Sequence, residues 1–360
     1  MVRSASTRGG SKVYKAIDLF AGIGGIRLGF EQAFNGGIDF VWANEKDEAC
    51  LSTYKANFED DIIDGRDINE VTKDITSIPD HDILLGGFPC QPFSIAGFQE
   101  GFTDKTRGTL FYNIVRILEQ KKPEAFLLEN VAFFQHHDHG RTWRTVRSVL
   151  ERELGYAVYS ETLNARDFGL PQNRPRFFMV GFRDKSLPFN FPKPLGRSSL
   201  KGILQHNVGN KYYISQRYLN SMKEHRRRHE AAGHGFGYII LEPEGIANTL
   251  VVGGMGHERN LIKDSPPEDC WSDGEQDLSK PNSEGVRRLT PREYARLQGF
   301  PDDYRQVVSD TQAYKQFANS VPVAVVKAIA GEIKITLEGS RDPRSNLFYW
   351  AKGVTQVAQQ

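Results

Sequence analysis

The chain has 360 residues, of which 39% are hydrophobic and 25% are charged, and its formal net charge is +1. This composition is typical of a soluble globular protein, and no run of 18 apolar residues is present that could span a membrane. Only three cysteines occur, without a CxxC pair or metal-ligand spacing, so we expect no metal site, no disulfide and a cytoplasmic location.

Apolar runs alternate with amphipathic segments from residue 13 to about residue 183, after a short basic tail that we expect to be disordered. Such alternation predicts βαβ units, and therefore an α/β fold with a mainly parallel sheet. The expected strands are residues 13–20, 40–44, 82–85, 125–128, 156–163 and 177–182. The expected helices are residues 25–34, 48–58, 109–120 and 144–154.

A glycine-rich turn, Ala-Gly22-Ile-Gly24-Gly25, separates the first strand from the first helix, and its glycines let a ligand approach the backbone closely. Glu45 follows Gly24 by 21 residues, at the end of the second strand, where a carboxylate can accept ribose hydroxyls. Arg27 stands where the dinucleotide fingerprint GxGxxG requires its last glycine. S-adenosylmethionine contains adenosine but no pyrophosphate, so it needs no such cradle. The alternative is a tight turn beside an exposed glutamate.

Cys90 stands in the sequence Phe-Pro-Cys-Gln-Pro-Phe-Ser, directly after an apolar run that ends at Gly87. Open α/β sheets place their chemistry at strand ends, and a thiolate there can attack an electron-poor ring carbon. The alternative is a small buried hydrophobic residue, as most cysteines are. Cys90 is therefore a candidate nucleophile.

Charged side chains also mark the ends of two later strands. Glu129 follows the apolar run 125–128, and its carboxyl group could meet the polar edge of a pyrimidine. Arg174 and Arg176 lie two residues apart before the strand at 177–182, so strand alternation predicts that both face one side. Taken singly, each of these residue types is more often a helix N-cap or part of a surface salt bridge.

The alternating pattern stops near residue 186 and gives way to a segment rich in Gly, Pro, Asn and His. Residues 201–240 carry seven Lys and Arg against two Glu, with tyrosines between the charges, which suits a phosphate backbone or a solvated helix face. Residues 241–284 carry ten Asp and Glu against three Lys and Arg. Because the acidic stretch 264–284 would repel phosphate, we expect it to form a solvent-facing loop away from nucleic acid.

Two further helices are expected near the C-terminus. One begins at Leu289 with a Thr cap and Pro291 in its first turn and closes at Gly299, and the other covers residues 320–337. The predicted organisation is a disordered tail at 1–12, a catalytic and cofactor-binding domain at 13–185, a smaller, mostly β or irregular recognition domain at 186–286, a return to the catalytic domain at 287–340, and a C-terminal tail at 341–360.

Six motifs in order resemble the bacterial C5-cytosine DNA methyltransferases, the modification enzymes of type II restriction–modification systems. The resemblance covers about residues 14–335, with Ala318 standing where the family usually has glycine. The motifs are Phe20-Ala-Gly-Ile-Gly-Gly25, Gly87-Phe-Pro-Cys90-Gln-Pro-Phe-Ser94, Glu129-Asn-Val131, Gln172-x-Arg174-x-Arg176, Arg288-Leu-Thr-Pro-Arg-Glu293 and Gln316-Phe-Ala-Asn319-Ser-Val321.

The resemblance implies a Rossmann-like methyltransferase domain and a pocket for S-adenosylmethionine, whose product is S-adenosylhomocysteine. Asp67 and Ile68 would hold the adenine, Glu45 would hold the ribose, and a mobile loop from Gln91 to about Leu110 would close over DNA. The implied cofactor residues are Phe20, Gly22, Gly24, Glu45, Asp67, Ile68, Gly87, Pro89, Leu110, Asn319, Ser320 and Val321.

The family resemblance also implies a mechanism. Cys90 attacks C6 of a cytosine, Glu129 hydrogen-bonds N3 and the 4-amino group, Arg174 binds the base oxygen, and Arg176 sets the loop and Glu129. The methyl group then passes to C5, the C5 proton is lost, and Cys90 departs. None of these atoms is reachable inside a stacked duplex, so the base must flip out.

Residues 186–286 would read double-stranded DNA, with Lys211, Arg217 and Arg226–Arg228 on phosphates and the loops 233–238 and 248–260 near base edges. We expect a monomer, without a membrane association, that protects DNA from a cognate restriction endonuclease. The alternative function is tRNA cytosine methylation, although the short Cys-Phe-Thr motif of those relatives is absent here. The DNA-contacting candidates are Gln91, Ser94, Arg107, Lys211, Arg217, Arg226, Arg227, Arg228, Phe236, Thr249 and Arg259.

Overall fold

The computed structural model describes residues 12–58, 62–88, 110–235, 237–252, 257–268, 270 and 277–339. Within these ranges no helix has both the length and the apolar character needed to cross a membrane.

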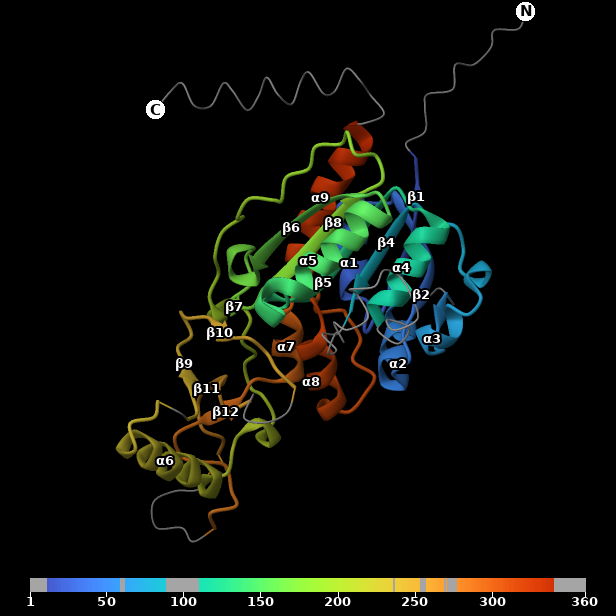
Figure 1. Ribbon diagram of the computed structural model, residues 1–360. Coiled ribbons are helices and arrows are strands. Elements are labelled where there is room, and N and C mark those ends of the chain that lie inside the picture. The colour runs from blue at the N-terminus through green and yellow to red at the C-terminus, as the bar shows by residue number, and fades with distance from the viewer. Residues whose placement is uncertain are drawn as a thin grey trace, which may run out of the picture.

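A seven-stranded sheet forms the centre of the larger part of the molecule, in the order β3-β2-β1-β4-β5-β8-β6 (Figure 1). All pairings are parallel except those of β8, which runs antiparallel to both β5 and β6. The predicted α/β fold with a mainly parallel sheet is therefore confirmed. The strands are β1 (Tyr14–Leu19), β2 (Ile38–Asn44), β3 (Ile63–Asp64), β4 (Ile83–Gly87), β5 (Ala125–Val131), β6 (Ala157–Asn164) and β8 (Pro175–Phe182).

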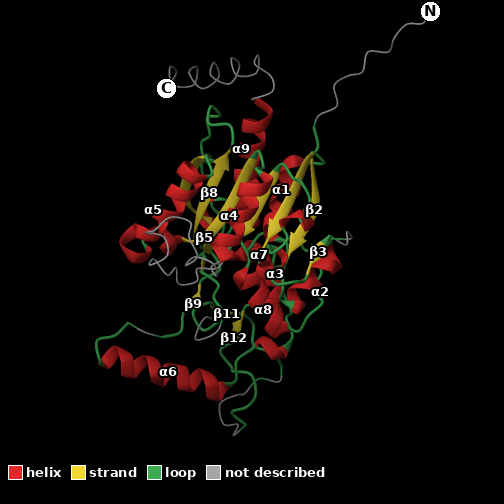
Figure 2. Ribbon diagram, turned by 45° about the vertical axis from the view of Figure 1, so that its right-hand side comes forward, coloured by secondary structure: helices red, strands yellow, loops and turns green. Residues whose placement is uncertain are grey.

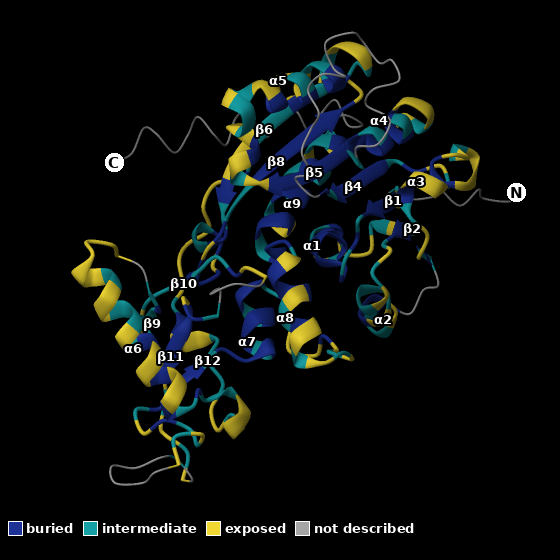
Figure 3. Ribbon diagram, turned by 60° about the horizontal axis from the view of Figure 1, so that its bottom comes forward, coloured by how far each residue is buried: buried dark blue, intermediate teal, exposed yellow. Residues whose placement is uncertain are grey.

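Helices cover both faces of this sheet, as Figure 2 shows. On one face, α1 (Gly25–Phe34) packs against α9 (Val323–Gly339), and Gly29 makes the approach possible because a Cβ there would lie 2.7 Å from Val326. On the other face, apolar side chains of α4 (Leu110–Lys121) and α5 (Arg141–Ser148) join a second core cluster. The central strands β1, β4, β5 and β8 are mostly buried, whereas the edge strand β6 is partly exposed (Figure 3).

Most predicted elements of this part lie within a few residues of the observed ones, and α1 has the predicted bounds. Four further elements complete the larger part: β3, α3 (Ile68–Val71), α2 (Glu48–Asn57) and α8 (Asp310–Asn319). Of these four, only α2 was predicted. The helix predicted at 320–337 begins later, at Val323, because Ser320 already closes α8 and its amide donates to Gln316 O.

The smaller part of the molecule contains a three-stranded sheet in the order β12-β11-β9 and the helix α6 (Gln216–Ala231). Its core consists of Ile214, Leu219, Met222, Tyr238, Leu261 and Val286. The pattern of the sequence did not predict α6, because this helix buries only Gln216, Leu219 and Met222, which leaves little apolar periodicity to detect. The remaining strands are β7 (Gln172–Asn173), β9 (Ile240–Leu241), β10 (Ala247–Asn248), β11 (Leu261–Lys263) and β12 (Val286–Arg288).

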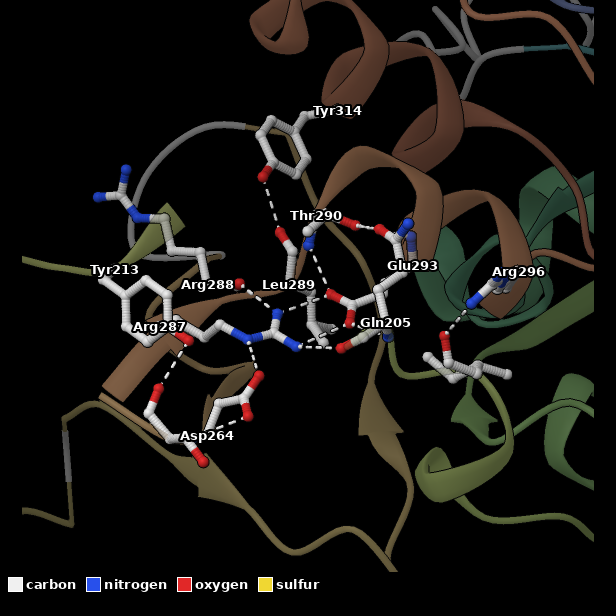
Figure 4. A network of polar contacts seen from close by, with 12 residues as sticks. Gln205, Tyr213, Asp264, Arg287, Arg288, Leu289, Thr290, Glu293, Arg296 and Tyr314 are labelled. Atoms are coloured by element: carbon white, nitrogen blue, oxygen red, sulfur yellow. Dashed lines mark hydrogen bonds and ion pairs between the residues drawn. The ribbon is translucent and has the colours of Figure 1, made fainter. Parts of the chain in front are cut away.

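A buried ion-pair network fixes the junction between β12 of the smaller part and α7 (Pro291–Leu297) (Figure 4). The Arg287 guanidinium donates to both carboxylate oxygens of Glu293 at 2.9 Å and to Asp264 at 3.0 Å. Glu293 also completes a capping box with Thr290, so the same carboxylate fixes the start of α7. Both Arg287 and Glu293 are fully buried.

The acidic stretch 264–284 is anchored at both of its ends. Asp264, at its start, pairs with buried Arg287, and Glu284, at its end, pairs with Lys223 of α6. Both ends of the stretch are therefore tied into the smaller part, although their carboxylates stay partly exposed. Glu268 and Asp277, between these ends, are exposed, and the solvent-facing loop stays a prediction. Residues 269 and 271–276 lie outside the described residues.

Candidate active site

The carboxyl ends of β1 to β5 meet at one edge of the sheet, and the predicted site residues lie there. β1 leads into the glycine turn, in which Gly22 and Gly24 have φ angles of 55° and 77°. Gly24 has a second reason to be glycine, since a Cβ there would come within 2.2 Å of the Phe58 ring. The turn then starts α1 at Gly25 without any side-chain cap.

Glu45 holds this glycine turn in place from the end of β2. Its Oε2 accepts from the Gly22 amide at 3.0 Å, and its Oε1 accepts from the Lys46 and Asp47 amides at 2.8 Å. Asp67, at the start of α3, pairs with Lys46 at 2.9 Å. The hydrogen bond from Lys46 lowers the pKa of Asp67, so this carboxylate carries charge at the rim of the site.

One cavity of about 520 Å³ joins these groups. Of the twelve cofactor residues implied by the sequence, Gly24 does not line the cavity, because it supports the turn from behind, and Pro89 lies outside the described residues. The others all line it: Phe20, Gly22, Glu45, Asp67, Ile68, Gly87, Leu110, Asn319, Ser320 and Val321. The structure thus brings residues from both ends of the sequence to a single cavity.

Glu129 and the two predicted arginines line the same cavity. Glu129 lies beside Gly87 in the β4–β5 pairing, and Arg176 Nε stands 3.1 Å from Glu129 Oε1. Burial raises the pKa of Glu129 from its usual value, while Arg176 and then Arg174 oppose the rise. A carboxyl group in this position can hold a proton that an exposed glutamate would have lost.

Arg174 is almost completely buried, and the main chain takes up both of its terminal nitrogens. Nη1 donates to Leu250 O at 2.9 Å, and Nη2 donates to Ala318 O at 2.6 Å and to Ser320 O at 2.7 Å. In the described part of the chain its Nε has no hydrogen-bond partner. The terminal nitrogens thus serve the protein itself, and because Nε is buried as well, the contact of Arg174 with a base oxygen stays a prediction.

Cys90 lies outside the described residues, as do Gln91, Ser94, Arg107 and most of the predicted mobile loop. The strand that leads to Cys90 is fixed beside Glu129, because Asn130 Nδ2 donates to Phe88 O at 3.0 Å. Cys50 also lines the cavity, but burial, followed by the charges of Glu45 and Asp47, raises the pKa of its thiol to about 12. Cys50 is therefore a poor candidate for a thiolate nucleophile.

Four residues of α8 line the cavity although the sequence analysis assigned none of them to the site: Gln312, Lys315, Gln316 and Ala318. Lys315 pairs with Asp47 at 3.0 Å, and Gln316 accepts from the Thr53 hydroxyl at 3.0 Å. The signal that could have predicted α8 was its serine cap, since the Ser309 side chain accepts from the Gln312 amide.

The candidate DNA contacts lie mostly in the smaller part. Lys211 pairs with Asp310 of α8 at 2.7 Å, so a phosphate would have to compete with this carboxylate. Arg217, Arg227, Arg228 and Arg259 are exposed, while Arg226 lies over the Tyr238 ring at 4.7 Å. The Thr249 hydroxyl donates to Asn173 O at 2.6 Å. Phe236 lies outside the described residues.

Comparisons with known proteins agree on one family. The family model for C-5 cytosine-specific DNA methylases matches residues 14–335. The chain is 45% identical to the Type II methyltransferase M.NlaX of Neisseria lactamica, over 92% of this chain and 99% of that protein. It is 46% identical to the Type II methyltransferase M.HpaII of Haemophilus parainfluenzae, over 88% of each. A crystal structure of a Spodoptera frugiperda DNMT2 mutant shares the fold, with a TM-score of 0.68 and 22% identity over 90% of this chain and 99% of that one.

Proposed function

This chain belongs to the C-5 cytosine-specific DNA methylases, and on that premise we propose that it acts as a type II modification enzyme through the residues assigned below. It methylates C5 of a cytosine flipped out of a short, specific site in duplex DNA. The observation that carries the assignment is the buried Glu129–Arg176 pair, which shares one cavity with Glu45 and with residues 318–321.

The residues present fit S-adenosylmethionine. Glu45 and Asp67 provide carboxylates for hydroxyl and amino groups, and Phe20 and Ile68 provide apolar surface. The glycine turn is packed so closely that a Cβ at Gly25 would meet Ser320 Oγ at 2.5 Å, so this wall has no room for a larger residue. When bound, the cofactor supplies an electrophilic methyl group on a sulfonium.

Glu129 is assigned to the polar edge of the cytosine. Because burial raises its pKa, the carboxyl group can hold the proton that hydrogen-bonds N3 and can accept from the 4-amino group. Arg176 fixes the carboxyl group through the ion pair at Oε1, and Arg174 is assigned to the base oxygen. These contacts stabilise the electron density that builds up on the ring after nucleophilic attack.

Cys90 is assigned as the nucleophile that bonds C6. Its motif follows β4, the strand that ends beside Glu129, whereas the raised thiol pKa of Cys50 excludes that cavity residue at neutral pH. Departure of Cys90 after loss of the C5 proton regenerates the enzyme.

Sequence recognition is assigned to residues 186–286, which contain none of the residues assigned to the chemistry. The exposed cations Arg217, Arg227 and Arg228 on α6 suit phosphate contacts, which position a duplex without reading its sequence. Replacement of one of them should weaken all duplexes about equally and reduce the salt dependence of binding.

The enzyme is proposed to act as a monomer in the cytoplasm, where it protects DNA from a cognate restriction endonuclease. Transfer of labelled methyl groups should occur to duplex DNA and not to tRNA, in line with relatives named as Type II methyltransferases. Bisulfite sequencing of DNA from cells that express the chain tests this function, because it identifies the modified base and the site together. Methylation of tRNA alone would refute it.

A further inference from the structure

Two short strands connect the two parts of the molecule. β7 contributes Gln172 and Asn173, and it pairs in parallel with Ala247 and Asn248 of β10, as their positions in Figure 1 suggest. Just beyond this pairing, the Leu250 amide donates to Gln172 Oε1 at 3.2 Å. The segment after β10 is therefore bonded to buried side chains as well as to the neighbouring strand.

Gln172 and Arg174 together bind both main-chain polar groups of Leu250. Gln172 accepts from its amide, and Arg174 Nη1 donates to its carbonyl at 2.9 Å. Gln172 is 0% and Arg174 only 1% exposed, so no water is available to replace a lost partner.

The same two side chains reach the wall of the cofactor cavity. Arg174 Nη2 donates to Ala318 O at 2.6 Å and to Ser320 O at 2.7 Å, and both residues line the cavity. Gln172 Nε2 donates to Leu297 O at 2.9 Å and lies 3.3 Å from Gln298 Oε1. Gln298 in turn donates to Phe317 O at 2.7 Å. A chain of buried hydrogen bonds thus runs from Leu250 to residues 317–320.

We propose that Gln172 and Arg174 are positioning residues that couple the binding of duplex DNA in the recognition region to the binding of S-adenosylmethionine. The inference rests on the function proposed above. A buried guanidinium cannot lose its acceptors without a large energetic cost, so a shift of Leu250 must be accompanied by a shift of residues 318–320. When duplex DNA orders the segment around Leu250, residues 318–320 are ordered with it, so the entropic cost of binding S-adenosylmethionine falls. The reverse holds when S-adenosylmethionine binds first.

Coupling of this kind is reciprocal, which makes it measurable without catalysis. The dissociation constant of S-adenosylhomocysteine is measured with and without a saturating duplex that carries the methylation site, and that of the duplex with and without S-adenosylhomocysteine. In the wild-type chain each ligand should lower the dissociation constant of the other by the same factor, about 10-fold or more. In Gln172→Met that factor should fall to below about 2, while the affinity of the free enzyme for S-adenosylhomocysteine stays within about 3-fold.

Gln172→Met is the sharpest test because Gln172 does not line the cavity. Arg174→Lys provides a second variant if Gln172→Met fails to fold, since lysine keeps the charge but cannot span three carbonyl groups. Thr53→Val is the matched control, because it removes a buried hydrogen bond to Gln316 on the same wall without touching the link to Leu250. The control should keep the wild-type factor.

The outcomes separate this inference from the function on which it rests. If the wild-type chain binds both ligands without mutual tightening, or if both variants keep the full factor, the coupling role is wrong and the proposed function stands. If the wild-type chain binds no site-containing duplex at all, the proposed function itself is wrong.

Discussion

Arg176 and Glu129 lie on neighbouring antiparallel strands, and Arg176 Nε stands 3.1 Å from Glu129 Oε1 inside the cavity. The pairing register explains the contact, because Arg176 stands opposite Val131, two residues beyond Glu129 on β5. The guanidinium fixes the direction of the Glu129 carboxyl group, and burial raises its pKa although Arg176 opposes the rise. Both properties suit a group that must recognise the edge of one base.

Replacement of Glu129 by glutamine should remove acid–base capacity while the shape is preserved. We expect Glu129→Gln to lower kcat by about 10²- to 10⁴-fold, the range for loss of a positioned proton-transfer group. Binding of S-adenosylhomocysteine should change little. Single-turnover methyl transfer measures the effect, and Glu161→Gln, at an exposed position on β6, is the control. An unchanged kcat in Glu129→Gln would remove Glu129 from the chemistry.

The Glu45 carboxylate should contribute to cofactor affinity in two ways, by a direct hydrogen bond and by holding the Gly22 amide. Glu45→Ala should weaken binding of S-adenosylhomocysteine by roughly 1.5–3 kcal/mol, the range for a hydrogen bond to a charged group. Calorimetry gives the dissociation constants, with Glu31→Ala on α1 as a control outside the cavity lining. If the affinity of Glu45→Ala matches that of wild type, the ribose assignment fails.

Asp18 should make stability depend on pH, since burial raises the pKa of its carboxyl from 3.8 to about 7, with Arg27 opposing the rise. Between these two pH values the folded chain holds a proton that the unfolded chain has released. The free energy of unfolding therefore falls as pH rises, by up to about 1.4 kcal/mol per pH unit, and this loss levels off above pH 7.

Asp18→Asn retains the shape of the side chain without the ionisation. Its stability relative to wild type should increase from about pH 4 to pH 7 and then remain constant. Urea unfolding of the full chain at a series of pH values checks this, with Asp39→Asn at an exposed position of β2 as the control. A stability difference that does not vary with pH would show that the Asp18 carboxyl titrates normally.

The Arg287–Glu293 pair should be one of the more costly interactions to break, because both side chains are 0% exposed. Arg287→Met leaves the Glu293 carboxylate buried without its main partner, so we expect a loss of about 3–5 kcal/mol in the free energy of unfolding. Arg147→Ala, which breaks a surface pair with Glu151, should cost no more than about 1 kcal/mol. Equal losses in the two variants would contradict the account of the network in Figure 4.

Much of the larger part could be predicted from the sequence, because long apolar runs and a glycine turn specify β1, α1 and the strands that follow. The elements that were missed have weak local signals: α6 buries few side chains, and β3 has only two residues. The partners of Arg174 could not be predicted at all. Leu250 lies 76 residues and Ala318 lies 144 residues from Arg174 in the sequence, and both accept through main-chain oxygens, which leave no trace in residue type.

The central claim is that this chain methylates cytosine through a covalent bond from Cys90, and mechanism-based trapping tests it most directly. Duplex DNA with 5-fluorocytosine at the methylated position should form a stable adduct in the presence of S-adenosylmethionine, because fluorine cannot leave as the proton does. Peptide mapping should place that adduct on Cys90, and Cys90→Ala should bind the duplex without trapping it. An adduct on Cys50 or Cys270, or no adduct with a site that the enzyme methylates, would contradict the account.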